Sequence, residues 1–161
     1  MFSSHPIAYL ITFRTYGTWL PGDERGWVHR DANVFDTPFL APRKGLRNAS
    51  TQAIEEPAPT FDANARRIIE DALRDACAHR GWELRAVNVR TNHVHCVISA
   101  DSTPEAVMRI LKARATRLLH ERRAIRGHMK PWSRHGSTIY LWNEKQLADA
   151  CNYVMEYQGS P

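Results

Sequence analysis

The sequence predicts an α+β domain with an antiparallel sheet, and three observations carry this prediction. Residues 61–80 show the apolar spacing of an amphipathic helix, whereas residues 7–14 are rich in β-branched and aromatic residues, as strands are. Two further strand-like segments, 82–90 and 93–99, are separated by only two residues, which predicts a β-hairpin. The full order is strand, helix, strand, strand, helix, strand and helix. Its first six elements form the split βαβ, or ferredoxin-like, pattern.

The first strand is followed by a long segment, at about residues 16–60, that we expect to be irregular. Glycine and proline recur along it and interrupt regular structure. They are Gly17, Pro21, Gly22, Gly26, Pro38, Pro42, Gly45, Pro57 and Pro59. An insert of this length is uncommon in a small domain and is often functional. Since 161 residues suit one domain, we expect residues 1–161 to form a single domain that carries this insert.

Capping residues mark the ends of the first two helices. Asp62 is the expected N-cap of the first helix, and Gly81 is expected to end it. Thr103 followed by Pro104 starts the second helix, which we expect to run to about Arg123.

Three more segments complete the chain. Residues 126–137 contain glycine and proline and are expected to form a loop, residues 137–142 a short strand, and residues 143–159 a last helix. Asn143 is the expected start of that helix and Gly159 its end. In a split βαβ fold both crossover helices cover one face of the sheet, so the last helix is the candidate to cover the other face.

Composition and charge narrow the class of protein. With 43% hydrophobic residues the chain can bury a core, and a net charge of +5 with a pI near 9.4 suits a polyanionic partner such as nucleic acid. Many soluble proteins are mildly basic without such a partner. Cys77, Cys96 and Cys151 form no CxxC motif, which argues against a disulfide framework or a structural zinc site and fits a reducing cytoplasm. No segment approaches the roughly 20 apolar residues of a membrane helix, so we expect a cytoplasmic protein with no membrane partner.

A histidine pair in the second hairpin strand, His93 and His95, is the sharpest local feature. Side chains two residues apart on a strand point to the same face, so the imidazoles stand side by side while Val94 and Cys96 face the helix-packed core. Two neutral imidazoles so placed can bind one divalent metal ion, together with at least one further ligand. By itself, such a pair is more often an ordinary surface or hydrogen-bonded pair.

The second predicted helix is strongly basic. Its cations outnumber its acids, Glu105 and Glu121, and are Arg109, Lys112, Arg114, Arg117, Arg122 and Arg123. They form either the ordinary solvated face of an amphipathic helix or a surface that contacts phosphates. Three further residues, with Trp132 nearby as a ring for base stacking, extend the set: Lys130, Arg134 and His135.

Two motifs together resemble a known family. His93-Val94-His95 matches the His-hydrophobe-His motif of the HUH nucleases, and residues 152–159, NYVMEYQG, resemble the catalytic helix of single-tyrosine transposases. These transposases include insertion-sequence enzymes and REP-associated tyrosine transposases. The opening strand, YLITFR at 9–14, is also similar, and the element order matches over nearly the whole chain.

The resemblance implies a metal-dependent transposase that nicks DNA and transfers strands. His93 and His95 would hold Mg²⁺ or Mn²⁺ at the scissile phosphate, and Tyr153 would attack phosphorus to form a 5′-phosphotyrosyl intermediate. A phenol, whose pKa is ordinarily near 10, needs a nearby metal ion or cation to become a competent nucleophile. The implied partner is single-stranded or hairpin DNA, and the expected contacts are Arg14, Arg109, Lys112, Arg117, Lys130 and Arg134. The family includes monomers and dimers, so a homodimer is left open.

The third metal ligand is where the match is loosest. The family has an amide side chain one turn after the tyrosine, where this chain has Tyr157, and the nearest amide is Gln158. Five residues along an ideal helix rotate by roughly 140°, so Gln158 reaches the site only if Gly159 unwinds the last turn. Gln158 is therefore the candidate ligand, and Tyr157 is the rival nucleophile.

Two other functions are open from the sequence. A ferredoxin-like domain with basic and aromatic residues can bind nucleic acid without cutting it, and Tyr153 would then be a core-edge residue beside an apolar helix stripe. Against this, the central strands carry histidines where an RNA-recognition motif has aromatic residues. A metal-dependent phosphodiesterase would use water in place of Tyr153. Covalent attachment of the protein to cut DNA distinguishes the transposase from both alternatives.

Overall fold

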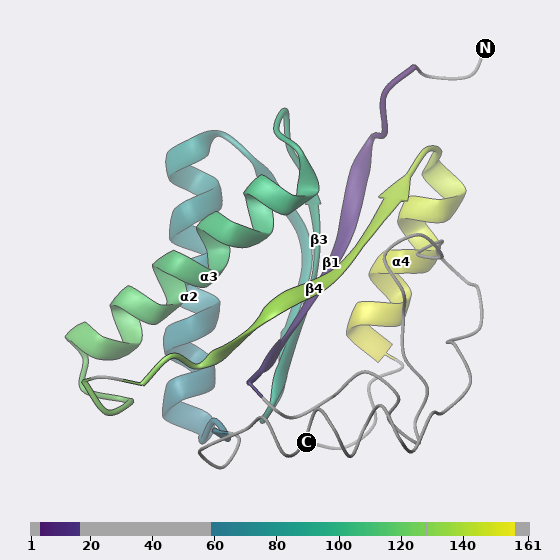
Figure 1. Cartoon of the computed structure of the whole chain (residues 1–161). Coiled ribbons are helices and arrows are strands. Elements are labelled where there is room, and N and C mark those ends of the chain that lie inside the picture. Colours follow the sequence, from purple (N-terminus) through teal and green to yellow (C-terminus); the bar gives the residue numbers. More distant parts are fainter. Residues whose placement is uncertain (1–3, 17–58, 128, 157–161) are drawn as a thin grey trace, which may run out of the picture.

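The computed structural model describes residues 4–16, 59–127 and 129–156 (Figure 1). Four strands form one sheet: β1 (Ala8–Thr15), β2 (Glu83–Val89), β3 (His93–Ser99) and β4 (Trp132–Leu141). They lie in the order β2-β3-β1-β4, and each neighbouring pair is antiparallel. This arrangement confirms the predicted α+β fold. Most of the predicted irregular segment at 16–60 lies outside the described residues.

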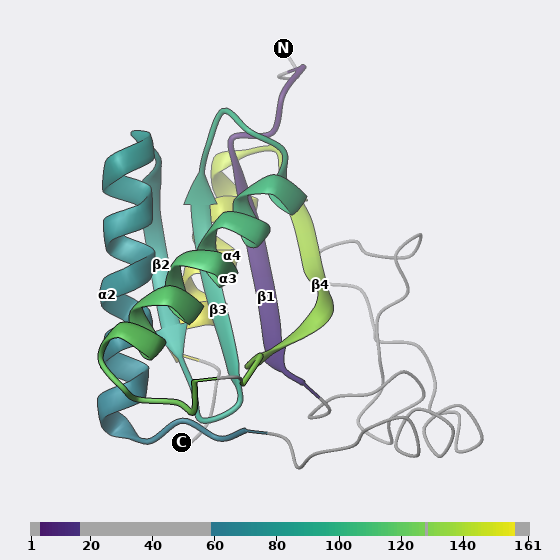
Figure 2. The same cartoon turned by 60° about the vertical axis from the view of Figure 1, so that its left-hand side comes forward.

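Helices cover both faces of the sheet. The crossover helices α2 (Ala63–Arg80) and α3 (Pro104–Glu121) lie together on one face, and α4 (Glu144–Glu156) lies behind the sheet in Figure 2. α2 and α3 contact each other, and α4 contacts β2 and β3. The prediction that the last helix covers the second face is therefore confirmed.

Each face of the sheet packs its own hydrophobic core. The larger core lies between the sheet and helices α2 and α3, and it contains Ile11, Phe13 and Leu111, all fully buried. The smaller core lies beneath α4 and joins Val97 of β3 to Val154 of the helix. One strand can supply both cores because successive side chains along it point to opposite faces.

The capping residues expected from the sequence are those that the helices use. Asp62 Oδ1 accepts a hydrogen bond of 2.7 Å from the Ala65 amide, and Gly81, with a φ of 71°, ends α2 in the left-handed conformation. Thr103 and Asn143 accept equivalent bonds at the starts of α3 and α4, at 3.3 and 2.9 Å.

The prediction of a loop at 126–137 is wrong in its last part, because β4 begins at Trp132. The Trp132 ring packs against Phe13 with 4.7 Å between centroids. Lys112 Nζ, on α3, donates to two backbone carbonyls of β4 at 3.0 and 3.3 Å. These contacts, together with pairing along β1, turn a segment with local loop character into an edge strand.

The last helix is described as far as Glu156. Its expected end at Gly159, together with Tyr157 and Gln158, lies outside the described residues. In the described parts of the chain, no helix combines the length and the apolar character that crossing a membrane requires.

Candidate active site

His93 and His95 lie side by side on the face of the sheet that α4 covers, and their neighbours Val94 and Cys96 point into the larger core. The two imidazole rings are 4.7 Å apart between centroids, with 79° between their planes. His95 is only 4% exposed, whereas His93, at the hairpin turn, is partly exposed. The same-face placement expected from strand alternation is confirmed.

Each histidine has its Nδ1 atom engaged by a neighbouring side chain. His93 Nδ1 donates to Asn92 Oδ1 at 2.7 Å, because an amide oxygen only accepts. This tautomer leaves the lone pair of His93 on Nε2, the form in which an imidazole binds a metal ion. Thr12 Oγ1, on β1, forms a hydrogen bond of 2.8 Å with His95 Nδ1. When Thr12 accepts in that bond, His95 also presents the lone pair of Nε2.

Tyr153 is brought to the histidine pair by the packing of α4. Leu147, Ala150 and Val154 are buried against the sheet, and Tyr153, beside them, is partly buried. Its ring lies 5.8 Å from that of His95 between centroids, with 81° between the planes. Residues from β3 and α4 that are far apart in the sequence thus gather at one place.

Asn88, which sequence reasoning did not single out, fastens α4 at this point. It lies opposite His95 in the β2–β3 pairing, and its Nδ2 donates a hydrogen bond of 2.9 Å to the Val154 carbonyl. Val154 follows Tyr153 directly, so the bond fixes the helical turn that carries the phenol. The only signal in the sequence is one polar residue between two valines, which is equally typical of a solvent-facing strand position.

Polar side chains occupy this end of the α4 face, next to the apolar residues of the smaller core. Thr12 and Arg14 of β1 lie opposite His95 and His93 in the strand pairing. Farther along the same strands, Ala8, Leu10 and Val97 on this face are apolar and belong to the smaller core. The polar end combines imidazoles, a phenol and a guanidinium, which is a set suited to a phosphodiester.

The cations of α3 lie on the opposite side of the sheet from the histidine pair. Arg109 and Arg117 are exposed there, and Arg117 Nε contacts the Glu121 carboxylate at 2.9 Å. Two more arginines form ion pairs with acids of α2: Arg114 with Asp75 at 2.7 Å, and Arg122 with Asp71 at 3.4 Å. Much of the basic character of this helix is therefore balanced within the fold.

The remaining candidate DNA contacts lie on β1, on α3, and along or just before β4. Lys112 is half-buried where it bonds to β4, and this burial lowers its pKa to about 8. Lys130 lies just before β4 and Arg134 within it, and both are exposed. Of the six cations predicted to contact DNA, Arg14 is the one paired across strands with the histidine motif.

Within the described residues, no group of three or more His, Cys, Asp or Glu side chains could hold a metal ion. The histidine pair is a donor set of two, and the expected third ligand, Gln158, lies outside the described residues. Two imidazole nitrogens fit a divalent ion whose other ligands include oxygen atoms from phosphate and water.

The thiols are unsuited to nucleophilic chemistry. Burial raises the pKa of Cys77 to about 11 and raises the pKa of Cys96 further. Cys151, on α4, is partly buried and its pKa is also raised, mainly by burial. Near neutral pH all three thiols are protonated, so none of them competes with Tyr153 as a nucleophile.

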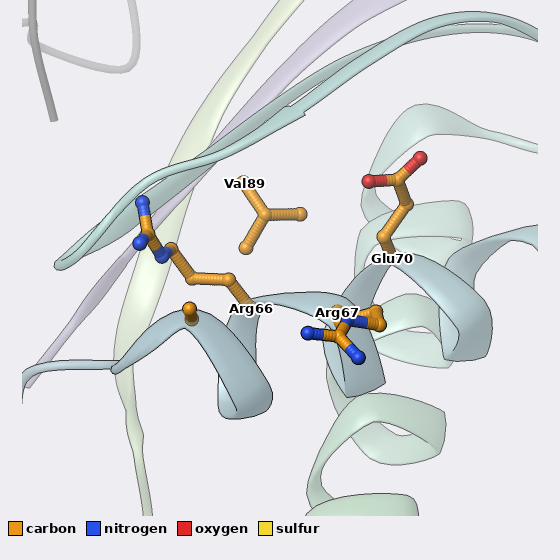
Figure 3. A pocket seen from close by; sticks show the side chains of 5 residues that line it. Arg66, Arg67, Glu70 and Val89 are labelled. Atoms are coloured by element: carbon orange, nitrogen blue, oxygen red, sulfur yellow. The ribbon is translucent and has the colours of Figure 1, made fainter.

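A shallow cavity of about 260 Å³ opens beside the start of α2 (Figure 3). It is lined by Ala63, Arg66, Arg67, Glu70 and Val89. In Figure 3, Arg66 and Glu70 extend on either side of Val89. The cavity shares no residue with the histidine face and is not part of the candidate site.

Comparisons with known proteins bear on the family. The family described as "Transposase IS200 like" matches residues 54–156, and no curated protein matches the chain. A solved REP-associated tyrosine transposase bound to a REP hairpin aligns with a TM-score of 0.54 at 11% identity, over 96% of this chain and 67% of that one. A protein of Deinococcus radiodurans R1, whose own transposase assignment is provisional, aligns with a TM-score of 0.48 at 16% identity, over 99% and 95%. The first alignment shows a shared fold, and because the family match spans more than half of the sequence, the chain belongs to the IS200-like transposase family.

Proposed function

We propose that this transposase is metal-dependent, and that it nicks single-stranded or hairpin DNA and rejoins it through a 5′-phosphotyrosyl intermediate on Tyr153. One observation carries the proposal. Two imidazoles from β3 and a phenol from α4 gather at the polar end of one face of the sheet. Membership of a transposase family supports chemistry on DNA strands.

His93 and His95 would hold a divalent ion, Mg²⁺ or Mn²⁺, through their Nε2 atoms. The family generally uses a divalent metal ion, and the Nδ1 atom of each ring is already engaged by a side chain. When bound, such an ion offsets the negative charge that develops on the oxygens of the scissile phosphate. Gln158 is the proposed third protein ligand.

Tyr153 is the proposed nucleophile. Its Oη attacks phosphorus, the P–O3′ bond breaks, and the phenolic proton passes to solvent. The departing oxygen takes up a proton and leaves a 3′-hydroxyl. Because the new P–O bond is again a phosphodiester, a second 3′-hydroxyl can reverse the step and join another strand without ATP.

The DNA partner is proposed from charge and from a structural neighbour. The similar REP-associated transposase is bound to a hairpin, and this chain has a net charge of +5. Arg14, opposite His93 across the β1–β3 pairing, is the cation best placed for phosphates next to the cut. More distant DNA would contact the exposed cations Arg109, Arg117, Lys130 and Arg134, while Lys112 supports β4 through its bond to the Ser133 carbonyl.

The test is a denaturing gel of the protein after incubation with hairpin oligonucleotides and Mn²⁺ or Mg²⁺. The label is placed on the 3′ side of the cut, because that strand keeps the 5′-phosphate and stays on the protein. A labelled protein band that requires metal and is lost in Tyr153→Phe and His95→Ala supports the proposal. Tyr16→Phe is the matched control, since it removes the same hydroxyl from an exposed tyrosine, and it should form the adduct.

Three other outcomes would each point elsewhere. An adduct that survives Tyr153→Phe but is lost in Tyr157→Phe assigns the nucleophile to Tyr157. Cleavage without any adduct indicates a phosphodiesterase that uses water. Binding without cleavage, over a panel of hairpins that includes those flanking the gene, indicates a non-catalytic DNA-binding module.

A further inference from the structure

Three aromatic rings lie in a row at the corner where β1 begins and β4 ends. The Tyr9 and Tyr140 rings are 5.5 Å apart between centroids, and the Tyr140 and Trp142 rings are 6.0 Å apart. Tyr9 is buried, but Tyr140 is 46% exposed and Trp142 45% exposed. Large aromatic side chains are usually covered in a folded protein, so two neighbouring half-exposed rings indicate a surface that contacts something.

The backbone holds this aromatic row in place. The Ile7 amide donates to the Leu141 carbonyl at 2.8 Å, which closes the β1–β4 pairing beside Tyr140. The Trp142 amide donates to Gln146 Oε1, in the first turn of α4, at 2.7 Å. A rigid platform loses little conformational freedom when a ligand stacks on it.

A cavity of about 330 Å³ lies against the row. Two chain segments form part of its wall: His5 and Pro6, which precede β1, and Ala100 to Pro104, which lead into α3. The rings of Tyr9, Tyr140 and Trp142 form the rest. Its lining mixes flat apolar rings with polar groups, and its size suits a single flat heteroaromatic ring and not a duplex.

The carboxylates at this corner favour the base of a nucleotide over its phosphate. Asp101 is in the cavity wall, with its Oδ1 held by Trp82 Nε1 at 3.0 Å. Glu105, in the first turn of α3, accepts from Thr138 Oγ1 at 3.3 Å on the neighbouring part of β4. Two carboxylates disfavour a phosphate here, whereas a carboxylate accepts hydrogen bonds from the amino and imino groups of a base.

We propose that this aromatic corner, formed by Tyr9, Tyr140, Trp142 and Asp101, binds one unpaired nucleobase of the DNA by stacking on Trp142 and Tyr140. The corner is at the opposite end of β3 from His93 and on the opposite face of the sheet. Six strand steps of about 3.3 Å separate the two ends, roughly 20 Å. The base therefore belongs to a segment several nucleotides from the cut, outside the reacting phosphate. This inference rests on the proposed DNA partner but not on the proposed chemistry.

The test is an abasic scan of binding, made in the Tyr153→Phe background so that cleavage plays no part. Each unpaired position of a hairpin with single-stranded flanks is replaced in turn by an abasic site, and Kd is measured by fluorescence anisotropy. Stacking of one base is lost at one position, so Kd should rise there about tenfold. Trp142→Ala should raise Kd for the intact DNA by a similar factor, and the abasic site at that position should then add nothing further.

Two variants and one assembly measurement keep the result unambiguous. Trp142→Phe retains a ring and should recover most of the lost affinity, and thermal unfolding verifies that both variants fold. The proposal would be overturned if the loss of affinity in Trp142→Ala and the loss caused by an abasic site added together at every position of the DNA. An unchanged Kd in Trp142→Ala would overturn it as well. So would sedimentation showing a dimer that dissociates in Trp142→Ala, because the corner would then contact a second copy of the chain. Absence of a covalent adduct in wild type would overturn the proposed chemistry and leave this binding result intact.

Discussion

At the scale of single residues, His95 is held in position by the fold itself. Its ring is almost fully buried, its Nδ1 is bonded to Thr12, and its edges meet the rings of His93 and Tyr153. An imidazole held in this way loses little freedom when it binds an ion, and its partner on Nδ1 helps to direct Nε2. The partner residues therefore matter to metal affinity although they do not touch the metal.

Thr12→Val tests this role of the hydroxyl. Valine keeps the shape of threonine but removes the bond to His95 Nδ1, so the Kd for Mn²⁺ should rise about tenfold or more, as other losses of a ligand's supporting bond do. Isothermal titration of Mn²⁺ measures it without DNA. Thr138→Val is the matched control, since that hydroxyl contacts Glu105 on the other face, and its Mn²⁺ affinity should stay at the wild-type value. Equal effects of the two substitutions would contradict the assignment.

Burial of Cys77 makes stability depend on pH. Its pKa is raised to about 11 from 9.0, so above pH 9 the unfolded chain loses the thiol proton while the folded chain keeps it. The contribution of the protonated Cys77 thiol to the free energy of unfolding is therefore fully present below pH 9 and is lost as the pH rises to about 11. Urea unfolding at pH 8 to 10 should show wild type losing stability relative to Cys77→Ala, with a slope that approaches about 1.4 kcal/mol per pH unit. Parallel pH curves for the two proteins would rule this contribution out.

At the scale of elements, α4 is held to the sheet by an apolar stripe and by one partly buried hydrogen bond from Asn88. The stripe fixes the helix on the smaller core, and the Asn88 bond to the Val154 carbonyl fixes its last described turn. Because Tyr153 lies in that turn, the geometry of the candidate site depends on how firmly the helix end is attached.

Asn88→Ala should loosen the end of α4 without disturbing the rest of the fold. Loss of one hydrogen bond that leaves a carbonyl unpaired lowers the free energy of unfolding by about 1–3 kcal/mol. Amide hydrogen exchange in residues 150–156 should accelerate, while exchange in β1 and β3 changes little. Asn64→Ala, at an exposed position of α2, is the control and should alter neither measurement appreciably. Uniform acceleration over all elements would instead indicate a general loss of stability.

The pairing of β4 with β1 requires a glycine at position 136. A Cβ atom there would collide with the Thr12 carbonyl oxygen and with Met108 Sδ. The carbonyl is backbone and cannot move aside without shifting β1, so Gly136→Ala should lower stability by about 1–3 kcal/mol. Gly127→Ala is the matched control in the same urea titration, because a Cβ atom added there meets nothing within 4 Å apart from its own chain neighbours. Equal stabilities of the two variants would mean that β1 and β4 adjust more easily than this packing suggests.

At the scale of the whole molecule, the sheet separates two layers that carry different groups. The layer beneath α4 has the histidine pair, Tyr153 and Arg14, whereas the layer of α2 and α3 has most of the exposed arginines and the aromatic corner. DNA that reaches both layers must pass around an edge of the sheet. The cut and the more distant contacts can then be altered separately.

Arg14→Gln should weaken DNA binding through phosphate contact alone. We expect Kd to rise about tenfold near 0.1 M salt, and the slope of log Kd against log salt to fall by about one. Arg74→Gln is the matched control, because Arg74 is exposed on α2 and paired with Glu70. Anisotropy titrations at several salt concentrations distinguish the two. If both variants change the slope equally, DNA binding depends on the net charge of the protein and not on a phosphate contact at the histidine face.

Local sequence determined most elements of this protein. Asp62, Thr103 and Asn143 cap helices because a short polar side chain reaches free amides within the next turn, which is information carried in a few residues. The alternation of His93, Val94 and His95 likewise settled which residues share a face, since that follows from the period of a strand. The element order then gave the split βαβ fold and a face for the last helix.

Only the tertiary structure decided what depends on contacts between distant segments. The first half of β4 is a strand because β1, Trp132 and Lys112 hold it, although its local sequence resembles a loop. Asn88 and Thr12 joined the candidate site because pairing of β1, β2 and β3 sets them opposite His95, and nothing in their own neighbourhoods indicates this. The basic helix α3 came to lie on the far side of the sheet from the histidine pair. Net charge could not predict that, because the face on which a charge lies depends on how the layers pack.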